Sequence, residues 1–262
     1  MHYHERTYAF RGPGLGAAVK YLLIVNGALF FLKLVTGWRL IGWLGLTPTL
    51  IWHKGYLWQL VTYMFLHGGF WHLAINMFVL WMFGTELERT WGTKQFLKYY
   101  FVTGIGAGLL SLIATPNSAI PTVGASGAIF GLLVAYAMIY PNRLIYLWFF
   151  IPIKAKYLAL ILGVFELIAT LQLAKDGVAH WAHLGGMLVG FIYLKMATLA
   201  RGGFATFEKR RIRVVSPDDS ASEDLQQEVD RILRKISQLG IDSLTPEEKR
   251  TLERASRTFR NP

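Results

Sequence analysis

Six apolar stretches lie within residues 21–200, and they restrict the fold of this chain more than any other feature of its sequence. They cover residues 21–35, 70–85, 96–114, 124–140, 157–173 and 178–200. An α-helix needs about 20 apolar residues to cross the hydrocarbon core of a bilayer. The chain is also 53% hydrophobic and only 16% charged, which is too apolar for an ordinary soluble domain. The sequence therefore predicts an all-α, multi-pass membrane protein with six transmembrane helices.

The basic residues predict how these helices are oriented. One side receives Arg6, Arg11, Lys20, Arg89, Lys94, Lys98, Arg143, Lys154, Lys156 and the basic residues of 201–213, and the other side only Lys33, Arg39, Lys54 and Lys175. Cytoplasmic loops collect Lys and Arg, so both termini are expected in the cytoplasm and the uncharged loop 115–121 outside a plasma (inner) membrane. The net charge of +11 then reflects topology rather than nucleic-acid binding.

Two segments between the apolar stretches are predicted to lie along the membrane interface. Residues 36–69 mix Trp, Gly, Pro and charge without a run long enough to span, which indicates a long first loop with short interfacial helices. Residues 144–153 form a short apolar run bracketed by Pro141 and Pro152. That run is also too short to span, and we expect it at the interface.

The chain is expected to divide into a cytosolic segment (1–20), a membrane domain (21–200), a basic linker (201–215) and a cytosolic tail (216–262). The tail has apolar residues at helical spacing, which are Leu225, Val229, Ile232, Ile236 and Leu239. Gly240 offers a stop, and Thr245-Pro246-Glu247-Glu248 has the pattern of a capping box. We expect a soluble helical hairpin. The basic residues 209–213 precede this hairpin. They either bind anionic lipid headgroups or only set the orientation of the membrane helices.

Ser126 is the first candidate for chemistry, because polar residues inside spans are costly in lipid and are often functional. It follows Gly124 where the outer loop ends and a helix begins. The free N–H groups and the dipole of a helix start favour an adjacent oxyanion, which suits a nucleophile. The alternative is that Ser126 is only a small packing residue.

His183 is the matching candidate for a base. Gly186 and Gly190 share its helical face, and Gly127 and Gly131 form a second pair of small residues beside Ser126. Such pairs allow close helix contact, which would bring the imidazole to the serine hydroxyl. No acid stands at a matching position, so we expect a dyad, with Phe130 one turn below Ser126 able to stack on the imidazole.

Five further polar positions complete the candidate site and its surroundings. His72 and Asn76 are spaced i and i+4, so both can donate to a developing negative charge, although interhelical hydrogen bonding is the alternative. His180 is expected to support the site through a hydrogen bond, and His67 to link the first loop to the second span. Glu166 is expected to form a hydrogen bond within the bundle rather than to act on a gate.

Together these motifs resemble the rhomboid intramembrane serine proteases. The resemblance rests on residues 124–131 (GASGAIFG), 182–190 (AHLGGMLVG), 67–77 (HGGFWHLAINM) and 83–88 (FGTELE) with Gly92. It covers roughly residues 21–200 and includes a similar first span (Leu23-Ile24-x-Asn26). In the loop element 57–60, many rhomboids have Arg where this chain has Gln59. We expect Glu88, with Arg89, to be a structural anchor.

The resemblance implies an intramembrane serine endopeptidase that cleaves transmembrane proteins without a metal or cofactor. It implies that Ser126 is the nucleophile, that His183 is the base and acid, and that His72, Asn76 and the Ser126 backbone N–H form the oxyanion hole. Span 5 would be a side gate for the substrate helix. A non-catalytic rhomboid-like membrane chaperone is the alternative, because a fold alone does not decide activity.

Other membrane proteases fit the sequence less well. Residues 1–200 hold only five carboxylates and no His-Glu-x-x-His motif, which a metalloprotease would need. Asp176 is the sole Asp before the tail, so an aspartyl dyad is excluded. The chain has no cysteine, which excludes thiol nucleophiles, and no internal repeat of the kind many transporters show.

Overall fold

The structure is a computed structural model, and it describes residues 15–147, 150–172, 178–200, 228–238, 240 and 243–260. The chain divides into two compact units, Met1–Lys209 and Arg210–Pro262. The predicted basic linker, the first 14 residues, and Leu225 and Leu239 of the tail lie outside the described residues.

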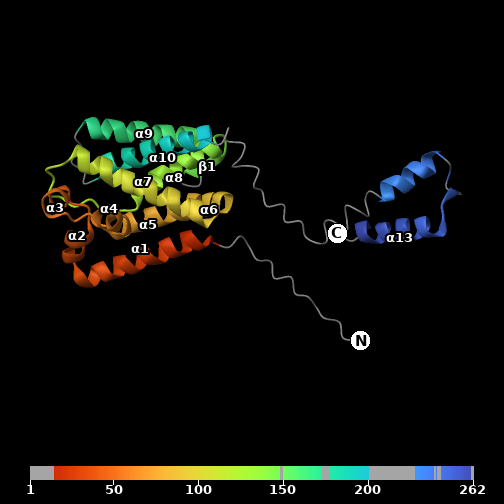
Figure 1. Cartoon of the computed structure of the whole chain (residues 1–262), viewed down its shortest axis with the longest axis horizontal. Helices are drawn as coiled ribbons and strands as arrows, with labels where there is room; N and C mark the ends of the chain where they lie inside the picture. Colours follow the sequence, from red (N-terminus) through yellow and green to blue (C-terminus); the bar gives the residue numbers. More distant parts are fainter. Residues whose placement is uncertain are drawn as a thin grey trace. The chain divides into compact units, whose positions relative to one another are not determined.

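Every predicted span coincides with helix in the first unit (Figure 1). The helices are α1 (Ala17–Thr36), α5 (Phe70–Val79) with η2 (Leu80–Gly84) and α6 (Thr85–Trp91), α7 (Thr93–Ala114), α8 (Ser126–Ile139), α9 (Ala155–Leu171) and α10 (His180–Ala200). Among the described residues, three helices are long and apolar enough to cross a membrane: α1, α7 and α10. The bent pair 59–65 and 70–91 makes a fourth if it counts as one span. The helical membrane fold is confirmed, and the six crossings stay a prediction.

The centre of the bundle consists of α7, α8 and α10, which pack against one another, with α1 and α9 on opposite flanks (Figure 1). Small residues permit this close packing. A Cβ added to Gly127 of α8 would lie 2.6 Å from the Cβ of Ala107, and one added to Gly131 would lie 2.6 Å from that of Thr103. Both distances are too short for real side chains, so α8 fits against α7 only with glycine at these positions.

The first loop contains four short helices, as predicted: α2 (Trp38–Leu44), α3 (Pro48–Lys54), α4 (Gln59–Thr62) and the 3₁₀ helix η1 (Tyr63–Phe65). Gln59 is fully buried and holds the loop together. Its Oε1 accepts from the Thr47 N–H at 3.0 Å, and its Nε2 donates to the Trp43 carbonyl at 3.1 Å. A bridge between Leu46 and Thr122 then attaches this loop to the segment before α8.

Contacts between elements fix both ends of α1. The buried carboxylate of Glu88 accepts hydrogen bonds from the backbone N–H groups of Ala18 and Val19, both at 2.9 Å. A carboxylate at a helix N-terminus satisfies free N–H groups and is favoured by the helix dipole, so Glu88 is a structural anchor, as expected. Near the other end, Lys33 Nζ donates to the carbonyl of Gly68 at 2.6 Å.

The helical segment from Phe70 to Trp91 is interrupted by the π-helical turn η2. Leu80, Phe83 and Gly84 of this turn are buried. Gly84 lies close to α1, because a Cβ added there would come within 3.1 Å of the Val19 side chain. A π turn contains one residue more than an α turn, so it accommodates an extra residue within this continuous helical segment.

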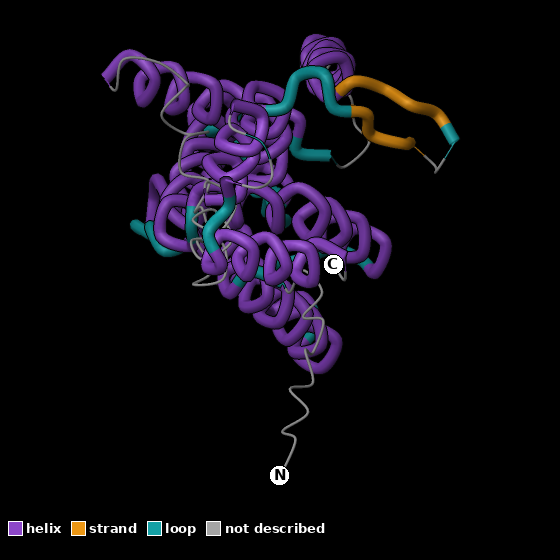
Figure 2. Tube along the Cα trace, turned by 90° about the vertical axis from the view of Figure 1, so that its right-hand side faces the viewer, coloured by secondary structure: helices purple, strands orange, loops and turns teal. Residues whose placement is uncertain are grey.

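The expectation of an all-α fold is wrong for residues 144–154. This segment forms a two-stranded antiparallel hairpin of β1 (Leu144–Leu147) and β2 (Ile151–Lys154), drawn in orange in Figure 2. Buried Ile145 packs it against the helical core. Pro152 would break a helix here, but it is tolerated in a hairpin with free outer edges. Ile145 pairs with Ile153, and β-branched residues favour such pairing.

The second unit contains a helix over residues 228–238 and α13 (Pro246–Arg260). The predicted capping box is present: the Glu248 N–H donates to Thr245 Oγ1 at 3.2 Å, and the Thr245 N–H donates to Glu248 Oε2 at 2.8 Å. Gly240 has φ +82° and follows the first helix. Lys235 reaches Glu248 at 2.8 Å, and this ion pair joins the two helices.

Candidate active site

Ser126 is the first residue of α8, and the chain reaches it through a constrained turn. Gly124 has φ +133°, a conformation that side chains rarely adopt, and its N–H donates to the carbonyl of Tyr63 at 2.9 Å. Ala125 is the N-cap residue of α8. The first N–H groups of a helix have no acceptor within the helix. Ser126 therefore lies beside backbone N–H groups that can donate hydrogen bonds to a negatively charged oxygen.

His183, in the first turn of α10, lies next to Ser126. Its Nε2 is 2.8 Å from the serine Oγ, which is hydrogen-bond distance for proton transfer. The ring of Phe130 stacks on the imidazole with centroids 4.4 Å apart and planes at 16°, as its position in the sequence predicts. A Cβ on Gly186 would overlap the Gly127 carbonyl, and one on Gly190 would overlap the Tyr99 hydroxyl, so both glycines bring α10 close to its neighbours.

The expectation that no acid reaches the histidine is wrong. Glu166 projects from α9, and its Oε1 lies 2.9 Å from His183 Nδ1. Its other oxygen lies 2.6 Å from Nδ1 of His180, which is the supporting hydrogen bond expected for His180. Glu166 is 4% exposed. A carboxylate, an imidazole and a hydroxyl therefore form a continuous hydrogen-bonded row from α9 through α10 to α8.

His72 lies on the other side of the space above Gly124. A Cβ added to Gly124 would be 2.8 Å from His72 Nε2 and 3.3 Å from Ser126 Oγ, so both polar atoms border the same small volume. The Nδ1 atom of His72 accepts from the Gly68 N–H at 3.4 Å. A neutral imidazole whose Nδ1 accepts carries its proton on Nε2. His72 therefore presents an N–H donor toward the space beside Ser126.

Asn76 and His67 lie next to His72. The Asn76 Nδ2 donates to the His72 carbonyl at 2.7 Å, and since an amide carries two hydrogens, the second is available for a ligand. The His67 ring meets the His72 ring edge-on at 5.0 Å. Within the described part of the chain, neither nitrogen of buried His67 has a hydrogen-bond partner. His67 thus packs the first loop against α5, in line with its predicted linking position.

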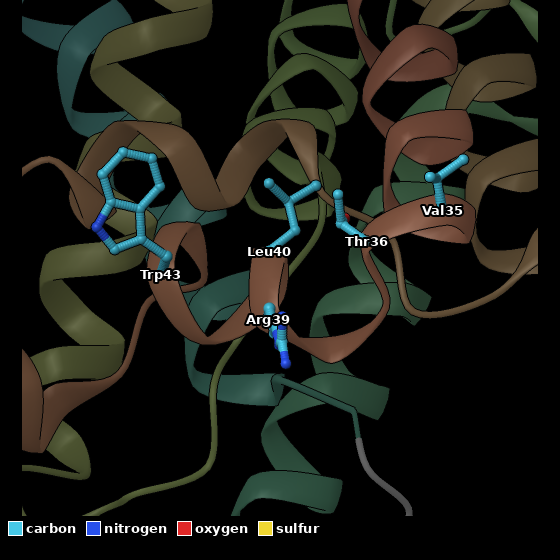
Figure 3. Close-up of a pocket in the computed structure, with 5 residues that line it drawn as sticks. All are labelled: Val35, Thr36, Arg39, Leu40 and Trp43. Atoms are coloured by element: carbon cyan, nitrogen blue, oxygen red, sulfur yellow. The ribbon is translucent and has the colours of Figure 1, made fainter.

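Two other features could be binding sites. Glu166, His180 and His183 offer three ligand atoms within 4.8 Å of one another, a spacing that could hold a metal ion. The same atoms are already joined by hydrogen bonds. A surface hollow of about 540 Å³ at the end of α1 is lined by Val35, Thr36, Arg39, Leu40 and Trp43 (Figure 3). None of these lining residues belongs to the candidate site.

Comparison with known protein families covers most of the membrane unit. The rhomboid domain matches residues 54–199, which is more than half of the chain and includes Ser126 and His183. The chain belongs to the rhomboid family. This rhomboid is accordingly a multi-pass membrane protein, and its family is that of the intramembrane proteases. Residues 221–258 match a family of unknown function (DUF6576), which covers the tail helices.

Curated relatives agree with this assignment. Rhomboid protein 1, mitochondrial, of Saccharomyces cerevisiae is 32% identical over 66% of this chain and 51% of its own length. Rhomboid protease GluP of Bacillus subtilis is 32% identical over 62% of this chain and 30% of its own length. RHOMBOID-like protein 6, mitochondrial, of Arabidopsis thaliana is 36% identical over 51% of this chain and 41% of its own length. This rhomboid thus spans about half of these relatives or less.

Proposed function

We propose that this rhomboid is a serine endopeptidase that hydrolyses peptide bonds in or near the transmembrane segments of membrane proteins. The observation that carries the proposal is the 2.8 Å contact between Ser126 Oγ and His183 Nε2 at the start of α8. The stacked Phe130 supports it, because a held imidazole keeps its lone pair directed at the hydroxyl. Family membership supports the same reaction class.

Hydrolysis would proceed in two stages. In the first, His183 Nε2 takes the proton of Ser126 while Oγ attacks the substrate carbonyl carbon and forms a tetrahedral intermediate. The peptide C–N bond then breaks, and the leaving nitrogen takes the proton back from Nε2. In the second stage, a water molecule attacks the acyl-enzyme with His183 again acting as base, which releases the acid product and restores the serine.

The negative oxygen of the tetrahedral intermediate would be held above Gly124. The Nε2–H of His72 borders that volume. The backbone N–H of Ser126 at the start of α8 and the second amide hydrogen of Asn76 would be the remaining donors. Removal of one such donor in a hydrolase typically costs about 100- to 1000-fold in rate. Gly124 is required here because a side chain would fill the space meant for the oxygen.

The membrane arrangement follows from the same assignment. We infer that this rhomboid crosses the membrane six times, with both termini in the cytoplasm. Ser126 then lies near the outer face of the plasma membrane, where water can reach it. Its partners are transmembrane substrates and the lipid bilayer. Hydrolysis needs an extended substrate backbone, so Gly or Pro near the outer end of the substrate helix favours cleavage, with α9 as the side gate. The tail forms a separate cytosolic unit.

The test is cleavage of a model transmembrane substrate by purified protein in detergent. We expect Ser126→Ala and His183→Ala each to abolish both cleavage and labelling by a serine-directed fluorophosphonate, because nucleophile and base act as one unit. Gly27→Ala is the matched control, since a Cβ at this position in α1 meets nothing within 4 Å. If Ser126→Ala cleaves as fast as the wild type, the protease proposal fails and a non-catalytic chaperone takes its place.

A further inference from the structure

We propose that Glu166 is a positioning residue that completes a Ser126–His183–Glu166 triad, a proposal that rests on the protease function above. The residues come from three helices: Ser126 from α8, His183 from α10 and Glu166 from α9. The two contacts of the imidazole are 2.8 Å to the serine and 2.9 Å to the carboxylate, one at each ring nitrogen. The imidazole therefore bridges the hydroxyl and the carboxylate.

The row of contacts selects one tautomer of the histidine. To take the serine proton, His183 Nε2 must carry a lone pair, so the proton of the neutral ring must be on Nδ1. An ionised carboxylate only accepts hydrogen bonds, and Glu166 Oε1 is placed to accept from that Nδ1–H. The same carboxylate stabilises the imidazolium that forms when the serine attacks. Without this carboxylate, the other tautomer would also be populated, and its Nε2–H cannot accept the serine proton.

His180 fixes the position of the carboxylate. Its Nδ1 lies 2.6 Å from Glu166 Oε2, so each carboxylate oxygen faces one imidazole nitrogen of α10. The side chains of Glu166 and His180 are only 6% and 5% exposed. A buried carboxylate is costly unless hydrogen bonds satisfy it, and two imidazole donors do so here. His180 precedes His183 by three residues, so α10 presents both rings to α9 together.

The alternative is that Glu166 only attaches α9 to α10. A purely structural contact would affect unfolding temperature and substrate access, whereas a positioning residue affects the chemical step in a folded enzyme. The two roles are separated by an isosteric substitution, Glu166→Gln, which keeps the side-chain volume and removes the charge. Thr170→Val is the matched control: Thr170 is one turn further along α9, is 5% exposed, and donates to the backbone carbonyl of residue 166.

The experiment measures kcat, KM, unfolding temperature and fluorophosphonate labelling for the purified full-length variants. We expect Glu166→Gln to lower kcat and the labelling rate by about 100-fold or more, with KM and unfolding temperature close to wild type, and Thr170→Val to match the wild type. Proton NMR of the wild type should show a strongly deshielded imidazole N–H that is lost in Glu166→Gln.

Wild-type kcat in Glu166→Gln, with Ser126→Ala inactive, overturns the triad and leaves the protease proposal intact. A loss explained by KM or by unfolding, with an unchanged labelling rate in the folded fraction, assigns Glu166 a structural role and also overturns it. The triad is also overturned if the wild type binds one equivalent of metal tightly and Glu166→Gln abolishes this binding. Glu166, His180 and His183 would then be metal ligands. Activity in Ser126→Ala defeats the protease proposal itself.

Discussion

Replacement of Gly186 by alanine tests whether the approach of α10 to α8 determines activity. A Cβ at this position would overlap the carbonyl oxygen of Gly127, and both atoms belong to helical backbone that has no rotamer to change. Ordinary carbon–oxygen contacts are about 3.3 Å or longer, so α10 would have to move away by roughly 1 Å or more. Gly186 follows His183 by three residues in α10, so the displacement would also move the imidazole.

The expected effects follow from the size of the movement. Overpacking of a filled interface costs about 1–3 kcal/mol, which lowers the unfolding temperature of a protein of this size by roughly 2–12 °C. The contact between His183 Nε2 and Ser126 Oγ is 2.8 Å, and a shift of roughly 1 Å takes it beyond hydrogen-bond distance. Misplacement of catalytic groups by about 1 Å costs about 100-fold in rate.

The assay compares Gly186→Ala with Gly27→Ala in thermal unfolding and in cleavage of a model substrate. A Cβ at Gly27 in α1 has nothing within 4 Å, so this control is expected to be neutral or stabilising by up to about 1 kcal/mol, with wild-type activity. Full activity and an unchanged unfolding temperature in Gly186→Ala would refute the close contact. Equal losses in both variants would show that any added methyl group is harmful.

Three further outcomes are expected. His72→Ala and Asn76→Ala should slow cleavage by about 100- to 1000-fold yet keep residual fluorophosphonate labelling, because they leave the nucleophile in place; complete loss of labelling in folded protein would contradict this. The ammonium of Lys235 and the Thr245 N–H lower the pKa of Glu248 from 4.5 to about 2, so the stability it gives the tail is present above pH 4.5 and is lost as the pH falls toward 2; an NMR titration of its carboxyl near 4.5 would disprove this. Deletion of residues 216–262 should leave cleavage in detergent within about twofold of wild type, since the tail is a separate unit, and inactivity of the folded membrane unit would show otherwise.

Local spacing was enough to predict the helices and much of the candidate site. Residues at i and i+4 share a helix face regardless of tertiary structure, so the pairing of His72 with Asn76 could be foreseen. The small residues beside Ser126 and His183 indicated which faces of α8 and α10 approach one another. The capping box of the tail is also local, and its two hydrogen bonds are present.

The contacts of Glu166 could not be predicted in the same way. They depend on how α9 is rotated about its own axis and on its height relative to α10, and neither follows from spacing along one helix. The one available signal was the isolated carboxylate in the second half of the apolar stretch 157–173, since such a group needs a partner. The hairpin of residues 144–154 was missed because short apolar runs do not distinguish strand from helix, although Pro152 argued against a helix.

The π turn of residues 80–84 has a consequence for how the sequence of this segment can change. Successive residues of an α-helix are rotated by about 100°, and a π turn contains one residue more than an α turn. Before the turn, the rotational phase is fixed by His72, which must face Gly124, and after it by Glu88, which must face the start of α1. The extra residue is absorbed within the π turn, so deletion of one residue here would convert the turn to α-helix and leave both requirements in phase, whereas a deletion elsewhere in the segment would rotate one half by about 100°. In an alignment, a relative without the π turn should therefore show a one-residue gap inside this helix and keep both anchor positions.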